Sequence, residues 1–189
     1  ASIDNNLPGS ELSIGADTAL NNAVGALDSI KQSAAASHRC FVAESMGRKC
    51  GYLALMSGIA TGAERVYLHE DGLTLAQLAR DSARMVESFR SGRQLYLVIR
   101  NERASENYTL DVLAKIFAQE GRGLYDVRHA AIGHLQQGGD PSAFDRIMAT
   151  KLVAHALGLL ADQLEAGTHH SSYVGLTGGR ITHHRLEHM

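Results

Sequence analysis

Residues 133 to 146 read G-H-L-Q-Q-G-G-D-P-S-A-F-D-R, and they connect an apolar, strand-like run to a long helical pattern. Gly138 and Gly139 allow positive φ angles and a close approach of the backbone to a ligand. Asp140 followed by Pro141 predicts a helix N-cap and a first helical residue. A strand that passes through a glycine turn into a helix is a repeating unit of α/β proteins, so this stretch indicates the fold class.

Three polar side chains precede the glycine turn. His134, Gln136 and Gln137 are expected to end the strand and to face the N-terminus of the following helix. Free N–H groups and the helix dipole favour an anion such as a phosphate at that position. The stretch therefore predicts an anion-binding turn, and its spacing alone does not specify the ligand.

The segments on either side extend the pattern. An apolar run over residues 127–132 predicts the strand before the turn. After the turn, apolar residues recur at helical spacing until Gly167, where the helix should stop. These residues are Phe144, Met148, Leu152, Leu160 and Leu164. Residues 173–181 predict one last extended piece.

The N-terminal third alternates in the same way. Residues 1–14 contain closely spaced turn formers and predict a loop. Residues 17–33 have one apolar face at helical spacing and predict a helix. Residues 39–44 predict a buried strand, residues 50–60 a helix that is apolar on nearly all sides and hence buried, and residues 65–68 a second strand. Strand, helix and strand in this order indicate a βαβ unit.

A capping box formed by Thr74 and Gln77 starts the next predicted helix, and Gly92 stands where a left-handed terminal residue belongs. A strand over residues 94–99 and a helix over residues 109–120, ending at Gly121, follow. The alternation predicts an α/β fold with a mostly parallel sheet and helices on both faces. We expect a single domain over residues 1–189.

Composition narrows the classes of partner. The chain has 189 residues, of which 44% are hydrophobic and 20% are charged, and this is enough to bury the core of one ordinary domain. The formal charge of −2 and the scattered basic residues argue against a nucleic acid. Two cysteines, Cys40 and Cys50, with no signal peptide or long apolar span, predict a cytoplasmic location and no membrane partner.

Ten histidines raise the question of a metal site. His169 with His170, and His183 with His184, are adjacent in sequence. Adjacent residues on an extended segment point to opposite faces, and no cysteine or carboxylate stands at the usual ligand spacing. We therefore expect solvated histidines and no protein-bound metal.

Candidate ligand-binding residues lie at strand ends and on the loops that follow, because ligands of open α/β sheets bind there. Arginines and a histidine near a helix N-terminus suit a phosphate, and a carboxylate at a strand end suits a sugar hydroxyl. For each arginine the alternative is a surface ion pair, and for Asp4 it is a turn residue. The candidates are Asp4, Arg39, Met46, Gly47, Arg48, Glu102, Arg128, His134 and Gln137.

Four segments in order and spacing resemble the phosphofructokinase family. They are I-D-N-N-L-P-G at residues 3–9, I-G-A-D-T-A-L-N at 14–21, M-G-R-K-C-G-Y-L at 46–53 and the stretch at 133–146. The resemblance covers nearly the whole chain. It implies a phosphofructokinase-like lobe that binds fructose 6-phosphate, taken from a protein of two α/β lobes that assembles into a homo-oligomer.

The resemblance also implies roles for individual residues. Asp4 matches the catalytic base that takes the proton from the sugar 1-hydroxyl, and Arg48 lies near the transferred phosphoryl group in the family. Met46 and Gly47 match the motif that lines the active site. Glu102 matches the carboxylate on a sugar hydroxyl.

Phosphate contacts follow from the same resemblance. His134 matches a ligand of the sugar 6-phosphate, and Arg39 and Arg128 match arginines that reach the site of a neighbouring subunit. Ser2 is assigned to the substrate-binding residues. Ala1 precedes Ser2 where pyrophosphate-using relatives have a lysine, so the resemblance favours ATP as the donor.

Two residues depart from the pattern of active members. Asn6 stands where they have a second aspartate for Mg²⁺, and Gln137 stands where they have an arginine on the sugar phosphate. Losing that arginine should weaken phosphate binding by about 1.5–3 kcal/mol. The alternative is therefore a non-catalytic regulatory half that binds a sugar bisphosphate such as fructose 2,6-bisphosphate. The retained Asp4 favours an active enzyme.

The family's glycine-rich segments for ATP precede the motif that contains Asp4, and the chain starts at that motif. We therefore expect a fragment of an ATP-dependent 6-phosphofructokinase that is inactive alone. ATP and its Mg²⁺ would bind through the missing segments. A further alternative is an assembly piece with a vestigial site.

Overall fold

A four-stranded, entirely parallel sheet forms the centre of the main body of the protein. The computed structural model describes residues 3–34 and 38–186. The strands lie in the order β2-β3-β1-β4, so β1 and β3 are central. Their bounds are β1 (Arg39–Ser45), β2 (Arg65–Tyr67), β3 (Leu95–Asn101) and β4 (Asp126–Ala131). The predicted parallel sheet is confirmed.

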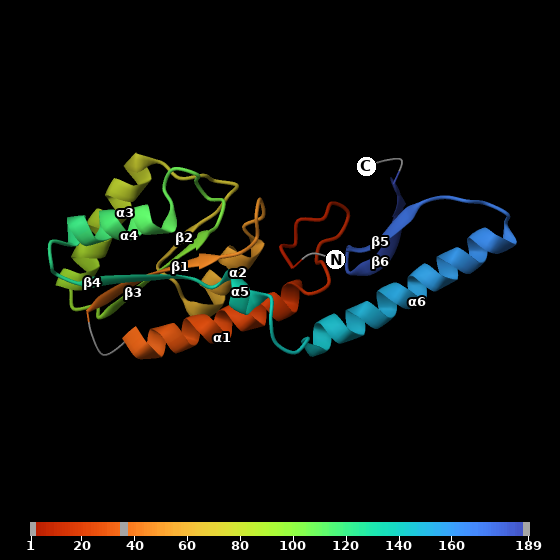
Figure 1. Ribbon diagram of the computed structural model, residues 1–189, viewed down its shortest axis with the longest axis horizontal. Coiled ribbons are helices and arrows are strands. Elements are labelled where there is room, and N and C mark those ends of the chain that lie inside the picture. Colours follow the sequence, from red (N-terminus) through yellow and green to blue (C-terminus); the bar gives the residue numbers. More distant parts are fainter. Residues whose placement is uncertain (1–2, 35–37, 187–189) are drawn as a thin grey trace.

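Helices cover both faces of this sheet (Figure 1). One face packs against α1 (Ala16–Ala34) and α2 (Tyr52–Thr61), and the other packs against α3 (Leu75–Arg90) and α4 (Leu110–Gly121). Side chains of β1 alternate between the two layers, as the pleat requires. Val42 belongs to the core under α3 and α4, whereas Ala43 belongs to the core under α1 and α2.

Local signals explain most helix ends. Thr74 and Gln77 form the predicted capping box of α3, and Gly62 ends α2 in the left-handed conformation at φ 66°. α4 ends at Gly121 as expected, and Arg122 at φ 46° takes the left-handed position after it. These ends fix the lengths of the connections between the helices and the sheet.

The prediction that the second helix is buried on all sides is wrong. Leu53 and Ala54 of α2 are buried, but Leu55, Met56 and Ile59 on its outer side are exposed by 39%, 36% and 67%. A helix on the face of a sheet has only one side to bury, whatever its composition. The apolar outer side of α2 is therefore a surface feature.

The stretch at residues 133–146 folds differently from its prediction. Residues Gly133–Gln136 form a short helix, α5, instead of ending the strand. The next helix, α6 (Ala143–Glu165), has Ser142 as its N-cap, because the Ser142 hydroxyl accepts from the Asp145 N–H. Asp140 and Pro141 thus precede the helix, and of the two glycines only Gly139, at φ 83°, has a positive φ.

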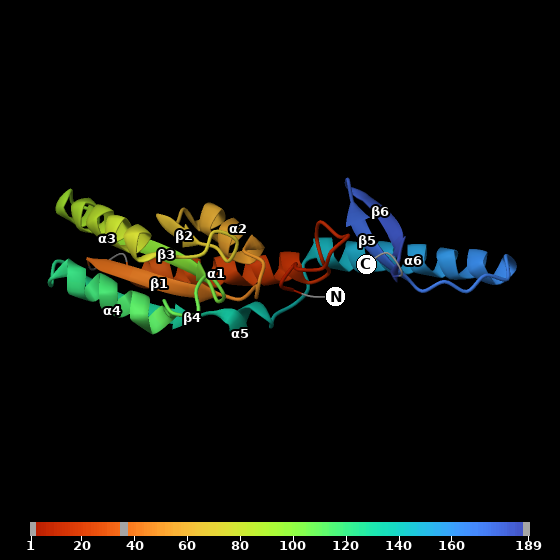
Figure 2. The ribbon, with the colours of Figure 1, turned by 90° about the horizontal axis from the view of Figure 1, so that it is seen from above.

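α6 leaves the body of the protein and extends away from it (Figures 1 and 2). A hairpin of β5 (Ser172–Thr177) and β6 (Arg180–Arg185) packs beside it, so the predicted single extended piece is two antiparallel strands. Gly178 and Gly179 make the turn at φ 59° and 71°. The hairpin also holds the N-terminal loop, since the Glu11 N–H donates to the Leu176 carbonyl at 2.8 Å.

The apolar face predicted for this last helix is largely open to solvent. Among the described residues of α6, only Asp145 and Met148 are buried. The exposed apolar side chains are Phe144, Ile147, Val153, Leu157, Leu160 and Leu164. α6 is also long and apolar enough to cross a membrane, but a core helix of a larger soluble protein has the same length and composition. The absence of a membrane partner stays a prediction.

Candidate active site

The loops that follow β1 and β3 meet at the carboxyl edge of the sheet, where open α/β folds bind ligands. β1 leads directly into Met46, Gly47 and Arg48, and β3 leads into Glu102. The N-terminal segment brings Asp4 to the same place. Together they border an open pocket of about 700 Å³ lined by Ile3, Asp4, Asn6, Met46, Arg48, Lys49, Glu102, Arg103 and Gln137.

Arg48 connects the two carboxylates of this pocket. Its backbone N–H donates to Oε1 of Glu102 at 2.8 Å, and its Nε lies 3.4 Å from Oδ2 of Asp4. The residue has φ 48°, which turns the chain sharply after the strand. The Arg48 side chain is 75% exposed, so most of its guanidinium remains available to a ligand.

Gly47 is required by the close packing of this turn. Its φ is 147°, and a Cβ at this position would lie 2.4 Å from the carbonyl oxygen of Cys50. The same carbonyl accepts from Nδ2 of Asn101 at 3.0 Å. A side chain at position 47 would therefore displace the turn that carries Arg48.

A buried amide holds the beginning of the turn. Gln136 of α5 is 1% exposed, and its Oε1 accepts from the backbone N–H of Met46 at 2.8 Å. Its Nε2 donates to the hydroxyl of Ser45 at 3.2 Å. The short helix that follows β4 thus fixes the loop that follows β1. The sequence places Gln136 next to a glycine turn but gives no sign of this long-range role.

A buried arginine supports the Glu102 loop from beneath. Arg100 of β3 is 2% exposed, pairs with the Glu44 carboxylate and donates to the Ser105 carbonyl at 3.0 Å. Burial raises the pKa of the Glu44 carboxyl, against the opposing effect of the Arg100 guanidinium. Burial also lowers the pKa of Arg100, against the effect of Glu44. Desolvation therefore outweighs the attraction within this pair.

The loop that carries Asp4 is closed on itself by its neighbour. Oδ1 of Asn5 accepts from the Ser13 N–H at 2.7 Å, and Nδ2 of Asn5 donates to the Glu11 carbonyl at 3.1 Å. The thiol of Cys50 donates to the Asn5 carbonyl at 3.3 Å, which ties the loop to the turn after β1. Asp4 is 8% exposed as a result and borders the pocket.

The structure brings most of the predicted site residues together. Asp4, Met46, Arg48, Glu102 and Gln137 line one pocket, and Gly47 shapes its wall. Lys49 and Arg103, which sequence reasoning missed, add positive charge there. Lys49 directly follows Arg48, and Arg103 directly follows Glu102. This adjacency to predicted site residues is the sequence signal that could have identified them.

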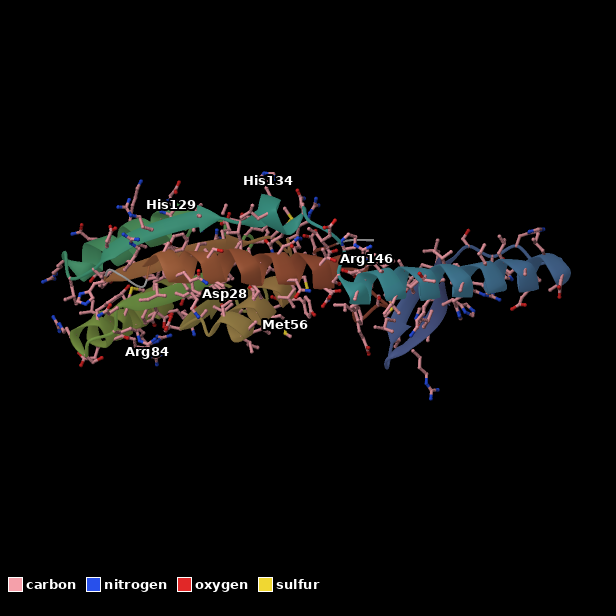
Figure 3. The ribbon with its side chains drawn as sticks, turned by 90° about the horizontal axis from the view of Figure 1, so that it is seen from below. Asp28, Met56, Arg84, His129, His134 and Arg146 are labelled. Atoms are coloured by element: carbon pink, nitrogen blue, oxygen red, sulfur yellow. The ribbon has the colours of Figure 1, made fainter. Side chains whose placement is uncertain are left out.

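Three other predicted residues do not line this pocket. His134 is exposed on α5 and points outward (Figure 3). Arg39 lies at the opposite, amino-terminal end of β1, with its Nε 3.6 Å from Asp126. Arg128 lies on the edge strand β4, with its Nε 2.9 Å from the same carboxylate. Ser2 is outside the described residues.

The charges suit a sugar phosphate better than a metal alone. Three basic side chains and two carboxylates surround the pocket, so it can neutralise a phosphate and accept from hydroxyl groups. Across residues 3–34 and 38–186, no group of three or more His, Cys, Asp and Glu side chains could hold a metal ion.

Comparison with known proteins identifies the fold and motifs. A sequence profile described as phosphofructokinase matches residues 1–160. The chain belongs to the phosphofructokinase family. It is similar to the ATP-dependent 6-phosphofructokinase of Dictyostelium discoideum, with 46% identity over 99% of this chain and 23% of that protein. It is 43% identical to the muscle-type enzyme of Homo sapiens over 87% of this chain and 21% of that protein.

A solved phosphofructokinase structure from Saccharomyces cerevisiae matches with a TM-score of 0.93 and 35% identity. The match covers 100% of this chain and 26% of that one, so it includes α6 and the hairpin. The phosphofructokinase-like lobe and the family resemblance are both confirmed. The chain spans just over a fifth of the length of the curated relatives that it matches.

Proposed function

We propose that this chain is the sugar-phosphate-binding part of an ATP-dependent 6-phosphofructokinase, which converts fructose 6-phosphate to fructose 1,6-bisphosphate. The observation that carries the proposal is the arrangement of Asp4, Arg48 and Glu102 around one pocket at the carboxyl edge of the sheet. Similarity to enzymes named ATP-dependent 6-phosphofructokinase supports it.

Phosphoryl transfer needs mainly positioning and charge stabilisation, with one group oriented on the nucleophile. Asp4 supplies that group, because its carboxylate can accept the proton of the sugar 1-hydroxyl as the oxygen attacks phosphorus. The guanidinium of Arg48, 3.4 Å from Asp4, lies where it can stabilise the transferred phosphoryl group. Glu102 accepts from a sugar hydroxyl while it holds the Arg48 backbone.

The pocket fits Mg²⁺ only as a companion of the nucleotide. Asp4 and Asn6 offer oxygen ligands on its wall, and Mg²⁺ is usually held by one or two carboxylates together with substrate phosphates. Bound there, the ion would neutralise charge on the donor phosphates. The residues of this chain would supply the base, the guanidinium and the sugar contacts.

Assembly into a homo-oligomer and a cytoplasmic location are parts of the same proposal. Arg39 and Arg128 lie away from the pocket of their own chain, as expected for side chains that reach a neighbouring subunit. The two cysteines are free, which supports a reducing compartment.

The test is Asp4→Asn in the full-length polypeptide that carries this sequence. Removing a general base should lower kcat by a factor on the order of 10²–10⁴, with folding unchanged. Asp28→Asn is the matched control, because Asp28 is exposed on α1 away from the pocket (Figure 3). Steady-state rates with fructose 6-phosphate and ATP measure both variants.

Unchanged turnover of the Asp4→Asn protein would refute the catalytic assignment. Titration calorimetry then distinguishes the other two functions. Tight binding of fructose 2,6-bisphosphate without phosphoryl transfer would support a regulatory half, and equal indifference to mono- and bisphosphates would support an assembly role.

A further inference from the structure

Two helix N-termini meet where α6 leaves the body of the protein. The first turns of α1 and α6 lie side by side in both ribbon views (Figures 1 and 2). Each N-terminus carries partial positive charge and free N–H groups, so their approach is unfavourable unless anionic acceptors lie between them. Two aspartates occupy that position, Asp17 of α1 and Asp145 of α6.

Asp145 caps the helix to which it does not belong. It is 3% exposed, and its Oδ1 accepts from the Gly15 N–H at 2.9 Å. Its Oδ2 accepts from the Thr18 N–H at 2.8 Å and from the Thr18 hydroxyl at 2.5 Å. The acceptor that an N-cap residue normally provides to α1 therefore comes from the first turn of α6.

The capping is reciprocal. The hydroxyl of Ser142, the N-cap of α6, donates to Oδ2 of Asp17 at 2.6 Å. The Ser142 N–H donates to the Thr18 hydroxyl oxygen at 3.0 Å. Asp17, Thr18, Ser142 and Asp145 thus form one hydrogen-bonded cluster, which we call the helix clamp.

The helix clamp is connected to Asp4 through packing. Gly15, which Asp145 holds, lies against Ile3, since a Cβ on Gly15 would be 3.0 Å from Cγ2 of Ile3. On the other side of Asp4, Asn5 is bonded to the Ser13 N–H at 2.7 Å. Both sequence neighbours of Asp4 are thereby held against the segment just before α1. Ile3 packs on Gly15, and Asn5 is bonded to Ser13.

We propose that Asp145 is a positioning residue, which fixes the start of α1 and thereby the placement of Asp4 in the pocket. The proposal rests on the proposed function, in which Asp4 is the catalytic base. Displacing a catalytic group by about 1 Å can cost on the order of 10²-fold in rate. A buried carboxylate that does not line the active-site pocket can therefore control the chemistry without touching the substrate.

Asp145→Asn tests this proposal, because the amide has the same shape but only one acceptor oxygen, so it cannot accept from both the Gly15 and the Thr18 N–H groups. Hydrogen exchange on the full-length polypeptide should show faster exchange over residues 3–18 by at least about 10-fold. Asp162→Asn, on the exposed surface of the same helix, is the matched control and should leave that exchange unchanged. Unchanged protection in the Asp145→Asn protein would overturn the proposal.

Kinetics separate positioning from general destabilisation. Asp145→Asn should lower kcat by about 10–100-fold with a smaller effect on the KM for fructose 6-phosphate. In an Asp4→Asn background the same substitution should cost nothing further, because the two changes act through one group. An equal loss in both backgrounds would overturn the proposal.

Failure of the proposed function gives a different result. In that case Asp4→Asn alone leaves turnover unchanged, and hydrogen exchange still decides whether Asp145 holds the Asp4 loop. If Asp145→Asn does not fold, Thr18→Val, which removes only the hydroxyl of the helix clamp, should shift exchange and kcat in the same direction by less.

Discussion

The side-chain amide of Gln136 holds the backbone of Met46 at 2.8 Å, so a helix that follows the edge strand fixes the loop that follows a central strand. This bond joins two of the four segments that resemble the family in sequence. It also predicts that a mutation of Gln136, which does not itself line the pocket, affects the pocket through the Met46 loop.

Replacing Gln136 by Leu should lower the free energy of unfolding by about 1–3 kcal/mol, because the partly buried Met46 N–H would lose its acceptor. Denaturant unfolding measures this change. Gln137→Leu is the control, since its parent side chain is exposed and should change stability by less than about 0.5 kcal/mol. Equal losses for the two variants would contradict the role assigned to Gln136.

Gly47→Ala should destabilise the protein by about 2–5 kcal/mol, through an unfavourable φ and overlap with the Cys50 carbonyl. Gly62→Ala provides the comparison, because that glycine has φ 66° with no atom within 4 Å of an added Cβ. Its cost should be only about 1–2 kcal/mol. Thermal unfolding of both variants would show whether crowding adds to backbone strain at Gly47, and equal costs would argue that it does not.

Gln137→Arg should strengthen binding of fructose 6-phosphate by about 1.5–3 kcal/mol, since a guanidinium forms charge-assisted, bidentate bonds to phosphate. Calorimetric titration of the full-length polypeptide measures the affinity. Gln137→Lys should gain less, because an ammonium lacks the planar fork. Affinity that does not respond to either cation would place the phosphate elsewhere in the pocket.

The Glu44 carboxyl should make stability depend on pH in the acidic range. Its pKa is raised in the folded state, so the folded protein binds more protons than the unfolded chain just above the ordinary glutamate pKa of about 4.3. Stability should therefore fall as the pH rises through that window. In Glu44→Gln this component of the slope should vanish, although leaving Arg100 unpaired lowers stability throughout.

Thermal midpoints of both proteins between about pH 4 and 7 would check this sign, since that range brackets the ordinary glutamate pKa. Glu106→Gln is a suitable control, because Glu106 is exposed in the same region and should leave the slope unchanged. If the slope of the wild type minus that of Glu44→Gln had the opposite sign, the Arg100 guanidinium would outweigh burial at Glu44.

Sequence periodicity predicted the body of the fold because local and tertiary preferences agree there. The helix that begins at Thr74 has a capping box, a one-sided apolar pattern and a terminal glycine, and the structure uses all three. The parallel strands followed from short apolar runs between helices. The exposed side of α2 could not be predicted, because Leu55 and Ile59 are aliphatic residues of the kind that is usually buried.

The start of α6 was predicted wrongly for a physical reason. Asp140 and Pro141 are a good local N-cap pair, but Ser142 is the N-cap, because its hydroxyl accepts from the Asp145 N–H. Ser142 and Asp145 also bond to α1, far away in sequence, and those bonds leave no local pattern. Arg39 and Arg128 lie away from the pocket for a similar reason. Arg39 is at the amino-terminal end of β1, and Arg128 is on the edge strand β4.

The exposed apolar side chains along α6 also affect how this polypeptide can be handled. A surface of that kind favours self-association, so the 189 residues expressed by themselves are expected to aggregate or to be held by chaperones. Crystallisation and calorimetry therefore require a polypeptide in which this surface is covered or altered. Charged replacements at Leu157 and Leu164 offer a way to obtain the lobe in soluble form.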